Sequence, residues 1–136
     1  MSHLILDASA MLAFFKRQER GHDRVVDIIK DPSYIKEAHA LNVMELYKRT
    51  YSLSASKAEE SVCQMRCLGV TIAEDMDDAF WKEMAWLKVT YGNVVSLADC
   101  AVIALAKRRN AELLGSDSDA FLGMEKAGII RLKRFR

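Results

Sequence analysis

Short apolar runs alternate with longer helical patterns along the whole chain, and this alternation restricts the possible folds more than any other feature. The apolar runs, typical of buried strands, cover residues 3–6, 34–38, 69–73, 111–115 and 129–132. Helical patterns fill residues 8–16, 22–30, 41–51, 54–68, about 74–91, 96–109 and 118–127. Strands separated by helices form parallel crossovers. The sequence therefore predicts an α/β fold, a three-layer α/β/α sandwich with a central five-stranded parallel sheet.

Length and composition narrow the class of protein. A chain of 136 residues has the usual size of one domain, so we expect a single domain over residues 1–136. Hydrophobic residues make up 51% of the chain, which is enough to build a core and too many for a disordered protein. The net charge of +1 does not by itself indicate a nucleic-acid partner, so only the distribution of charge can carry that information.

Cysteine spacing and hydropathy exclude further classes. Cys63, Cys67 and Cys100 form an odd set without zinc-like spacing, and the first two stand one helical turn apart, as buried reduced thiols can. The first residues lack the charged start of a secretory signal, and no apolar run is long enough to cross a membrane, because Asp99 interrupts the longest one. We therefore expect a cytoplasmic protein without membrane contact.

Three acidic residues stand where a parallel sheet presents its ligands, at strand ends and at the starts of the following helices. Asp7 directly follows the first expected strand, Asp117 follows the fourth, and Asp99 lies in the first turn of the apolar helix over 96–109. Each also has a purely structural explanation. Asp7 can cap the first helix, and Ser116 or Asp117 can cap the last. Ser96 and Asp99 fit a capping box.

The three acids favour a metal site when they are considered together. Like charges at one edge of a sheet repel each other, and burial strengthens the repulsion. A divalent cation removes this conflict, because Mg²⁺ or Mn²⁺ prefers oxygen ligands and keeps bound waters for chemistry. The site requires a strand order that brings Asp7, Asp99 and Asp117 together, and the residue pattern leaves that order open.

Glu45 is not nominated by periodicity. The side chains that we expect on the buried stripe of its helix are Val43, Met44, Tyr47 and Tyr51. Glu45 points away from the centre of that stripe and shares a face with Asn42 and Arg49. The pattern alone therefore describes a solvated Glu45, paired with Arg49 one turn later.

Basic residues would have to offset the acids for a phosphate backbone to approach. The candidate clusters are Lys16-Arg17 with Arg20, Lys48-Arg49, and the basic run over residues 131–136. We prefer Lys48 and Arg49, because they lie one turn beyond Glu45, and solvated helix faces stay open as the alternative for each cluster. Trp81 and Trp86 fall within a helix, where we expect them to pack rather than to stack on bases.

Four short motifs, in this order, resemble those of the PIN-domain family. They are Leu6-Asp7-Ala8-Ser9-Ala10, Asn42-Val43-Met44-Glu45-Leu46, Ser96-Leu97-Ala98-Asp99-Cys100, and Leu113-Leu114-Gly115-Ser116-Asp117-Ser118-Asp119-Ala120-Phe121. The third motif is the most similar, and its apolar continuation reaches Ala106. The motifs span nearly the whole chain, whose length suits the VapC-type toxins of prokaryotic toxin–antitoxin pairs.

The resemblance implies the strand order that brings the acids together, and a ribonuclease that depends on Mg²⁺ or Mn²⁺. The implied catalytic and metal-binding set is Asp7, Glu45, Asp99 and Asp117. Ser9 and Ser116 would orient these carboxylates, and Asp119 competes with Asp117 for the fourth role. Gly115 departs from the family, which often has a Thr at this position.

The resemblance also implies an RNA substrate and two protein partners. These are an antitoxin that blocks the site and a second copy of the chain in a homodimer. One alternative is a PIN fold without nuclease activity that acts as a binding or scaffold protein. A phosphoryl-transfer or receiver-like α/β domain fits less well, because Ser9 stands where a dehalogenase-type phosphatase needs a second Asp.

Overall fold

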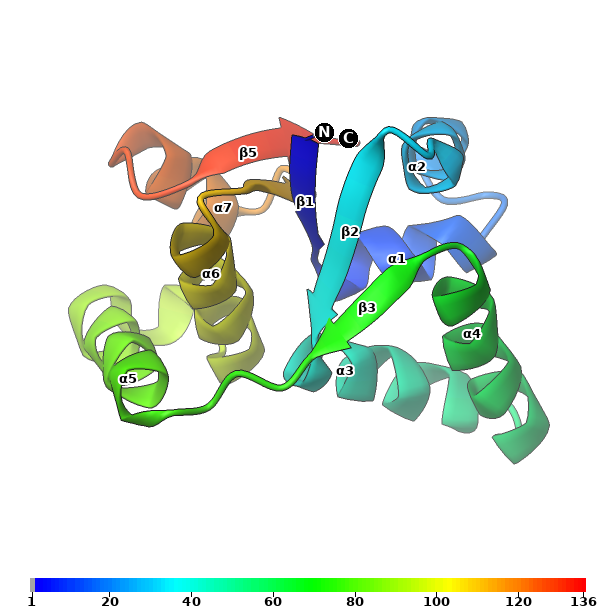
Figure 1. The fold of residues 1–136 in the computed structure, drawn as a ribbon, viewed down its shortest axis with the longest axis horizontal. Helices are drawn as coiled ribbons and strands as arrows, with labels where there is room; N and C mark the ends of the chain where they lie inside the picture. The colour runs from blue at the N-terminus through cyan, green and yellow to red at the C-terminus, as the bar shows by residue number, and fades with distance from the viewer. Residues whose placement is uncertain (1) are drawn as a thin grey trace.

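A five-stranded parallel sheet forms the middle of the molecule, as the sequence predicts (Figure 1). The computed structural model describes residues 2–136. The strands are β1 (Ser2–Leu6), β2 (Tyr34–His39), β3 (Val70–Ala73), β4 (Glu112–Gly115) and β5 (Arg131–Arg134). Their order across the sheet is β3-β2-β1-β4-β5, and every neighbouring pair is parallel. The chain therefore moves outward from β1 to β3 and then crosses back to β4 on the other side of β1.

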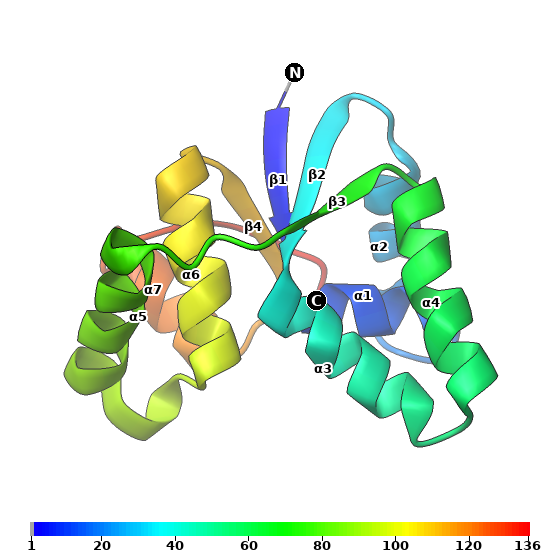
Figure 2. The ribbon, with the colours of Figure 1, turned by 60° about the horizontal axis from the view of Figure 1, so that its bottom comes forward.

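Helices cover both faces of the sheet and complete the predicted three-layer sandwich (Figure 2). The first face carries α1 (Ala8–Phe15), α2 (His22–Lys30), α3 (Ala40–Tyr51) and α4 (Ala55–Cys67). The second carries α5 (Asp78–Tyr91), the short 3₁₀ turn η1 (Gly92–Val94), α6 (Leu97–Arg109) and α7 (Asp119–Lys126). None of the helices formed by residues 2–136 is long and apolar enough to cross a bilayer.

Central elements are buried on every side, which explains their continuous apolar sequences. Leu4, Ile5 and Leu6 of β1 are fully buried, because helices cover both faces of a parallel sheet. Residues 100–106 of α6 are also buried, and they form much of the core on the second face. The end of β1 and the start of α6 are thus held firmly in place, and both bear acids of interest.

The last strand lies two residues later than the sequence predicts. The expected strand covered residues 129–132, whereas β5 pairs Arg131–Arg134 with β4. The Ile129 amide donates to the Met124 carbonyl at 2.9 Å after Gly128 turns with a φ of 74°, so it belongs to the end of α7. The edge strand consequently carries Arg131, Lys133 and Arg134.

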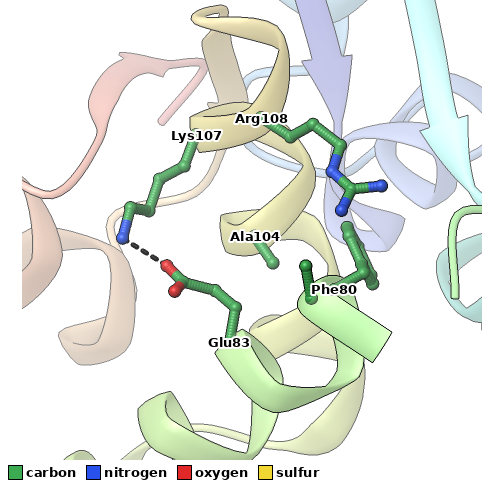
Figure 3. A pocket seen from close by; sticks show the side chains of 6 residues that line it. Phe80, Glu83, Ala104, Lys107 and Arg108 are labelled. Atoms are coloured by element: carbon green, nitrogen blue, oxygen red, sulfur yellow. Dashed lines mark hydrogen bonds and ion pairs between the residues drawn. The ribbon is translucent and has the colours of Figure 1, made fainter. Parts of the chain in front are cut away.

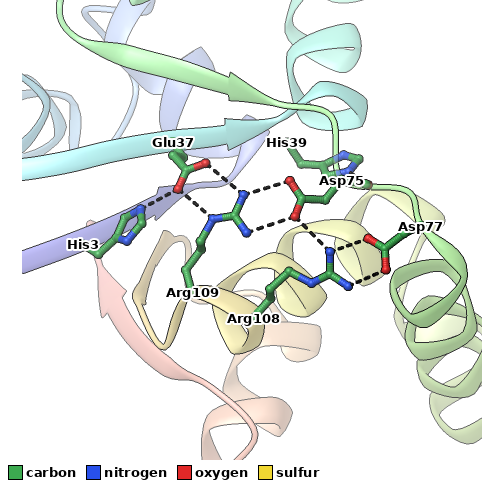
Figure 4. Close-up of polar contacts among 7 residues, drawn as sticks. All are labelled: His3, Glu37, His39, Asp75, Asp77, Arg108 and Arg109. Carbon is green, nitrogen blue, oxygen red and sulfur yellow. Dashed lines mark hydrogen bonds and ion pairs between the residues drawn. The ribbon is translucent and has the colours of Figure 1, made fainter.

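An ion-pair network fixes the far end of α6 to the sheet (Figure 4). Arg109 bonds both Glu37 of β2 and Asp75, at 2.9 and 2.8 Å, while Arg108 bonds Asp75 and Asp77. His3 of β1 contacts Glu37 at 2.6 Å. We expected Asp75 and Asp77 in the first turn of α5, but that helix begins at Asp78 and the two acids pair with the arginines instead. The network lies at the opposite end of α6 from Asp99.

Several side chains that we expected to be buried are exposed. Trp81 and Trp86 of α5 are 45% and 51% exposed, so neither packs in the core. Cys63 and Cys67 on α4 are also exposed, whereas Cys100 is buried. The buried face of α5 instead carries Phe80, Met84 and Leu87, and that of α4 carries Ala58, Ser61 and Met65.

Candidate functional site

Asp7 is a buried carboxylate at the carboxyl end of β1. It caps α1, because its Oδ2 accepts hydrogen bonds from the backbone amide of Ser9 at 3.0 Å and from the Ser9 hydroxyl. Only 6% of Asp7 is exposed. Burial raises the pKa of Asp7 to about 6, the Ser9 bonds oppose this rise, and the nearby charges of Asp99 and Glu45 add to it. The capping explanation is therefore correct, yet the residue also lies among other acids.

Asp99 takes part in the capping box that its sequence predicts. Its carboxylate accepts from the Ser96 amide at 3.0 Å, and its own amide donates to the Ser96 hydroxyl at 3.0 Å. These bonds hold Asp99 at the start of α6, the end that approaches the carboxyl edge of β1. Like Asp7, Asp99 therefore both caps a helix and lies beside other acids.

Glu45 faces the other acids, because α3 turns a polar side toward the molecule. Our expected buried stripe for this helix is wrong in part: Val43 packs against the core, but Met44 and Tyr51 are 61% and 56% exposed, and the fully buried residues are Asn42 and Leu46. Glu45 follows the face of Asn42 and is held by Arg49 at 3.6 Å. Periodicity missed this residue because the polar Asn42 is buried on this helix, whereas the apolar Met44 is exposed.

Asn42 is a functional candidate that the local sequence pattern does not single out. Its side chain is fully buried and accepts a hydrogen bond from the Ala8 amide at 3.3 Å. It also donates to the Ala98 carbonyl at 3.3 Å. Ala8 follows Asp7 and Ala98 precedes Asp99, so one amide on the helix of Glu45 ties together all three acid-bearing segments. The available signal was its place on the same helix face as Glu45, at the start of the second motif that resembles the family.

Two adjoining hollows share Asp7, Ser9 and Asp99 in their walls. The first, which we name the α3 hollow, measures about 310 Å³ and is also lined by Glu45, Lys16, Arg49 and Arg136. The second, the α7 hollow, measures about 350 Å³ and is also lined by Ser116, Ser118 and Asp119. The strand order has therefore brought Asp7, Asp99 and Glu45 to one site, with Asp119 on its other side.

Asp117 lies beside this site and is engaged by two arginines. Arg20 donates to its Oδ2 at 2.9 Å, and Arg136 Nε lies 3.9 Å from its Oδ1. Asp117 is not part of the wall of either hollow. The N-cap of α7 is Ser118, whose hydroxyl accepts from the Phe121 amide, so neither Ser116 nor Asp117 caps this helix.

The chemistry of these side chains suits a hard divalent cation. Carboxylate oxygens are the ligands that Mg²⁺ and Mn²⁺ prefer, and a bound cation would offset both the cost of burying the Asp7 charge and its repulsion from Asp99 and Glu45, which together raise the pKa of Asp7. Within residues 2–136, no three His, Cys, Asp or Glu side chains stand close enough together to hold one ion as they are arranged. Ion binding therefore requires side-chain movement, for which the hollows leave room.

Gly115, the departure from the family motif, is explained by packing. A β-carbon at this position would lie 2.9 Å from Cδ2 of both Leu113 and Phe121. Phe121 is 2% exposed and belongs to the core of the second face. The ring of Phe121 thus occupies the space into which a larger residue 115 would extend.

Basic residues reach the site from elements that are distant in sequence. Arg49 lines the α3 hollow, whereas Lys48, its predicted companion, is exposed and lies outside both hollows. Lys16 and Arg136 line the α3 hollow from the ends of two other predicted basic clusters. The positive charge near the acids therefore comes mainly from residues that the sequence did not favour.

A further hollow, between α5 and α6, contains no comparable chemistry (Figure 3). It measures about 290 Å³ and includes Phe80, Glu83, Lys107 and Arg108 in its wall. Glu83 is already paired with Lys107, and Arg108 lies over the Phe80 ring at 5.1 Å. These residues satisfy one another, so the acid-lined hollows are the better functional candidates.

Comparison with known proteins identifies the family. The sequence profile described as the PIN domain matches residues 4–126. No curated protein is significantly similar to the chain in sequence.

Solved structures share the fold at low sequence identity. The chain resembles DNA-bound VapBC from Salmonella typhimurium with a TM-score of 0.73 and 15% identity, over 100% of both chains. VapBC2 from Rickettsia felis, bound to a promoter DNA fragment, gives 0.72 and 9%, over 97% of this chain and 98% of that one. VapC20 from Mycobacterium tuberculosis, described as a sarcin–ricin loop cleaving toxin, gives 0.70 and 14%, over 88% and 94%. With a family profile that matches most of its length and this shared fold, the chain belongs to the PIN-domain family.

Proposed function

We propose that this PIN-domain protein is a metal-dependent endoribonuclease that hydrolyses RNA phosphodiester bonds. Asp7, Glu45, Asp99 and Asp117 are its catalytic and metal-binding carboxylates. One observation carries the proposal: three of these acids, from three separate segments of the chain, line one hollow at the carboxyl edge of the sheet. Ligand sites of open α/β sheets lie at this edge.

The roles of the individual residues follow from their positions. Asp7 and Asp99 border both hollows and are the main ligands for Mg²⁺ or Mn²⁺, with Glu45 on one side and Asp117 completing the set. A bound ion of this kind lowers the pKa of a coordinated water and offsets charge that develops on the phosphate. Ser9 orients the Asp7 carboxylate through its two hydrogen bonds. Ser116 and Asp119 support the site from the α7 hollow.

Substrate binding depends on basic side chains around the acids. Arg49 lies in the wall of the α3 hollow, and its side chain is 54% exposed. Its guanidinium group can therefore leave Glu45 and bind a phosphate oxygen instead. Lys48 precedes it on the exposed side of α3 and adds positive charge along the approach of the RNA.

The proposed biological setting is a toxin–antitoxin module in the cytoplasm. Two of the structural relatives are VapBC assemblies and a third is named as a toxin that cleaves the sarcin–ricin loop. We assign this chain the toxin role, with an antitoxin protein that blocks the site and a second copy of the chain as partners. Sedimentation of the purified chain, alone and with the product of a neighbouring reading frame, measures both associations.

RNA cleavage tests the nuclease proposal directly. Single-stranded and structured RNAs are incubated with the wild type in Mn²⁺ and then in excess EDTA. The Asp99→Asn variant is compared with Asp27→Asn, a matched change at an exposed position on α2. We expect cleavage that needs Mn²⁺, is lost in Asp99→Asn and persists in Asp27→Asn.

Two results would contradict the proposed function. Cleavage that survives EDTA, or that persists in Asp7→Asn, contradicts the metal mechanism. A folded protein that cleaves none of these RNAs, and whose Mn²⁺ calorimetry is the same in wild type and Asp99→Asn, supports the scaffold alternative.

A further inference from the structure

Arg136 brings its guanidinium group to the same hollow as the acids, although it is 129 positions from Asp7 in sequence. It lines the α3 hollow together with Asp7, Glu45 and Asp99. Its Nη1 lies 2.5 Å from Oε1 of Glu19, and its Nε lies 3.9 Å from Oδ1 of Asp117. The side chain is three-quarters buried, which is unusual for an arginine beside an open hollow.

The backbone that carries Arg136 is fixed from two sides. The Phe135 amide donates to the Gly115 carbonyl at 3.2 Å, and the Phe135 ring is 3% exposed in the core of the first face. On the other side, Gly21 adopts a φ of 87°, and a β-carbon there would lie 2.2 Å from the Phe135 carbonyl oxygen. Only glycine permits this approach. Arg136 is thus a side chain delivered to the hollow by a rigid support.

Its partners are carboxylates that an RNA phosphate can replace. Glu19 and Asp117 both belong to connecting segments, and each is 35% exposed at its side chain. Arg20, whose side chain is 73% exposed, holds the other oxygen of Asp117. Ion pairs this close to solvent contribute little stability, so exchanging one oxyanion for another costs little. The planar fork of arginine matches two oxygens of a phosphate as well as those of a carboxylate.

We propose that Arg136, with Arg20 beside it, binds the non-bridging oxygens of an RNA phosphate next to the acids and so positions the chain for cleavage. Glu19 and Asp117 occupy these guanidinium groups until the substrate arrives. RNA binding then frees the Asp117 carboxylate, which otherwise stands apart from the other acids. The inference rests on the proposed ribonuclease function for the identity of its ligand.

The experiment measures RNA binding without cleavage. Fluorescence anisotropy follows a labelled single-stranded oligoribonucleotide in the Asp7→Asn background across a series of salt concentrations. Adding Arg136→Ala should weaken binding roughly tenfold and lower the slope of log K against log salt by about 0.7, the value for one lost phosphate contact. Arg136→Lys keeps the charge and should retain the slope while losing part of the affinity, because lysine lacks the fork.

A matched control distinguishes a direct contact between Arg136 and an RNA phosphate from the effect of lowering the net charge of the protein. Arg131→Ala removes the same charge from the opposite end of β5, where Arg131 bonds the Asn110 carbonyl, and it should leave the slope unchanged. Equal slopes for Arg136→Ala and Arg131→Ala, with melting temperatures equal to that of the parent, would overturn the inference. This assay measures RNA binding and needs no cleavage. A failure of the proposed ribonuclease activity would appear in the cleavage experiment, whereas a failure of Arg136 to contact RNA would appear only in the binding slopes.

Discussion

The side-chain amide of Asn42 donates a hydrogen bond to the main-chain carbonyl of Ala98, 3.3 Å away, and so joins α3 to the start of α6. The same side chain accepts from the Ala8 amide at the start of α1. One buried residue therefore fixes the relative positions of α1, α3 and α6, the three helices that carry or directly follow the acids. The precision of the site depends on this residue as much as on the acids themselves.

Replacing Asn42 by alanine should lower the free energy of unfolding by about 1–3 kcal/mol, because it leaves the buried Ala8 amide without its hydrogen-bond partner. Urea denaturation measures the change, with Asn93→Ala in the exposed turn η1 as the control. RNA cleavage should fall further than the loss of folded protein explains. An Asn42→Ala protein as stable as the control would show that water replaces both bonds.

The buried carboxyl of Asp7 should make the metal-free protein less stable as pH rises. The pKa of Asp7 is raised from 3.8 to about 6, so the folded state binds its proton more tightly than the unfolded state does. The free energy of unfolding should therefore fall between pH 4 and pH 6, by up to about 3 kcal/mol. Asp7→Asn, which remains a good helix cap, should remove this fall and be the more stable protein at pH 7.5 in EDTA.

Adding millimolar Mn²⁺ at pH 7.5 should make the wild type more stable than Asp7→Asn, because only the wild type gains stability from the bound ion. Thermal melting of both proteins, with and without the ion, gives the comparison. A wild type that is more stable than Asp7→Asn in EDTA at every pH would contradict the electrostatic explanation.

Arg109 should be the most important member of the ion-pair network in Figure 4. It bridges Glu37 and Asp75 with four contacts between 2.8 and 3.3 Å, and its side chain is 26% exposed. We expect Arg109→Ala to cost about 2 kcal/mol, less than a fully buried pair because solvent screens the charges. Arg131→Ala on the edge strand is the exposed comparison.

The effect of Arg109 should disappear in acid. Hydrogen bonds from Arg109 are the main reason that the pKa of Asp75 lies below 3.8. A carboxylate with a lowered pKa stabilises the fold above its unfolded value and loses that contribution as pH falls through the folded value. The wild type and Arg109→Ala should therefore converge in stability as the pH falls well below 3.8, the ordinary pKa of the Asp75 carboxyl. A constant difference down to pH 2 would indicate lost packing rather than lost charge.

Restoring the hydroxyl of the family motif by Gly115→Thr should destabilise this protein. The new β-carbon would meet Leu113 and Phe121 at 2.9 Å, and overpacking of this kind costs about 1–3 kcal/mol. Phe121→Leu in the same chain should recover part of the loss, so the double variant should be more stable than the sum of the single changes predicts. If the two changes in the free energy of unfolding simply add, the strain caused by Thr at position 115 does not come from contact with Phe121.

The sequence predicted those parts of the site that depend on local rules. Asp7 and Asp99 were found because a strand end and a capping box are short-range patterns, and the structure has both. Glu45 was found only by resemblance, since α3 buries Asn42 and exposes Met44, the reverse of what hydropathy indicates. A polar side chain buried beside apolar ones, as Asn42 is beside Leu46, is typical of a site rather than of a core.

Long-range arrangements had no local signal. Arg20 and Arg136 meet at Asp117 across 97 and 19 positions, a juxtaposition that only the completed strand order creates. The two-residue error in β5 has a similar origin, because the Ile129 amide is taken by the end of α7 before the strand can begin. In both cases the deciding partner lies in another element.

The basic residues of β5 have a consequence for how copies of this protein can associate. β5 is an edge strand, so its outer backbone groups are open to pairing with another strand. Arg131, Lys133 and Arg134 would place like charges opposite one another if two such edges met, and this repulsion opposes continuous sheets between molecules. Growth into fibres through this edge of the sheet is thereby discouraged.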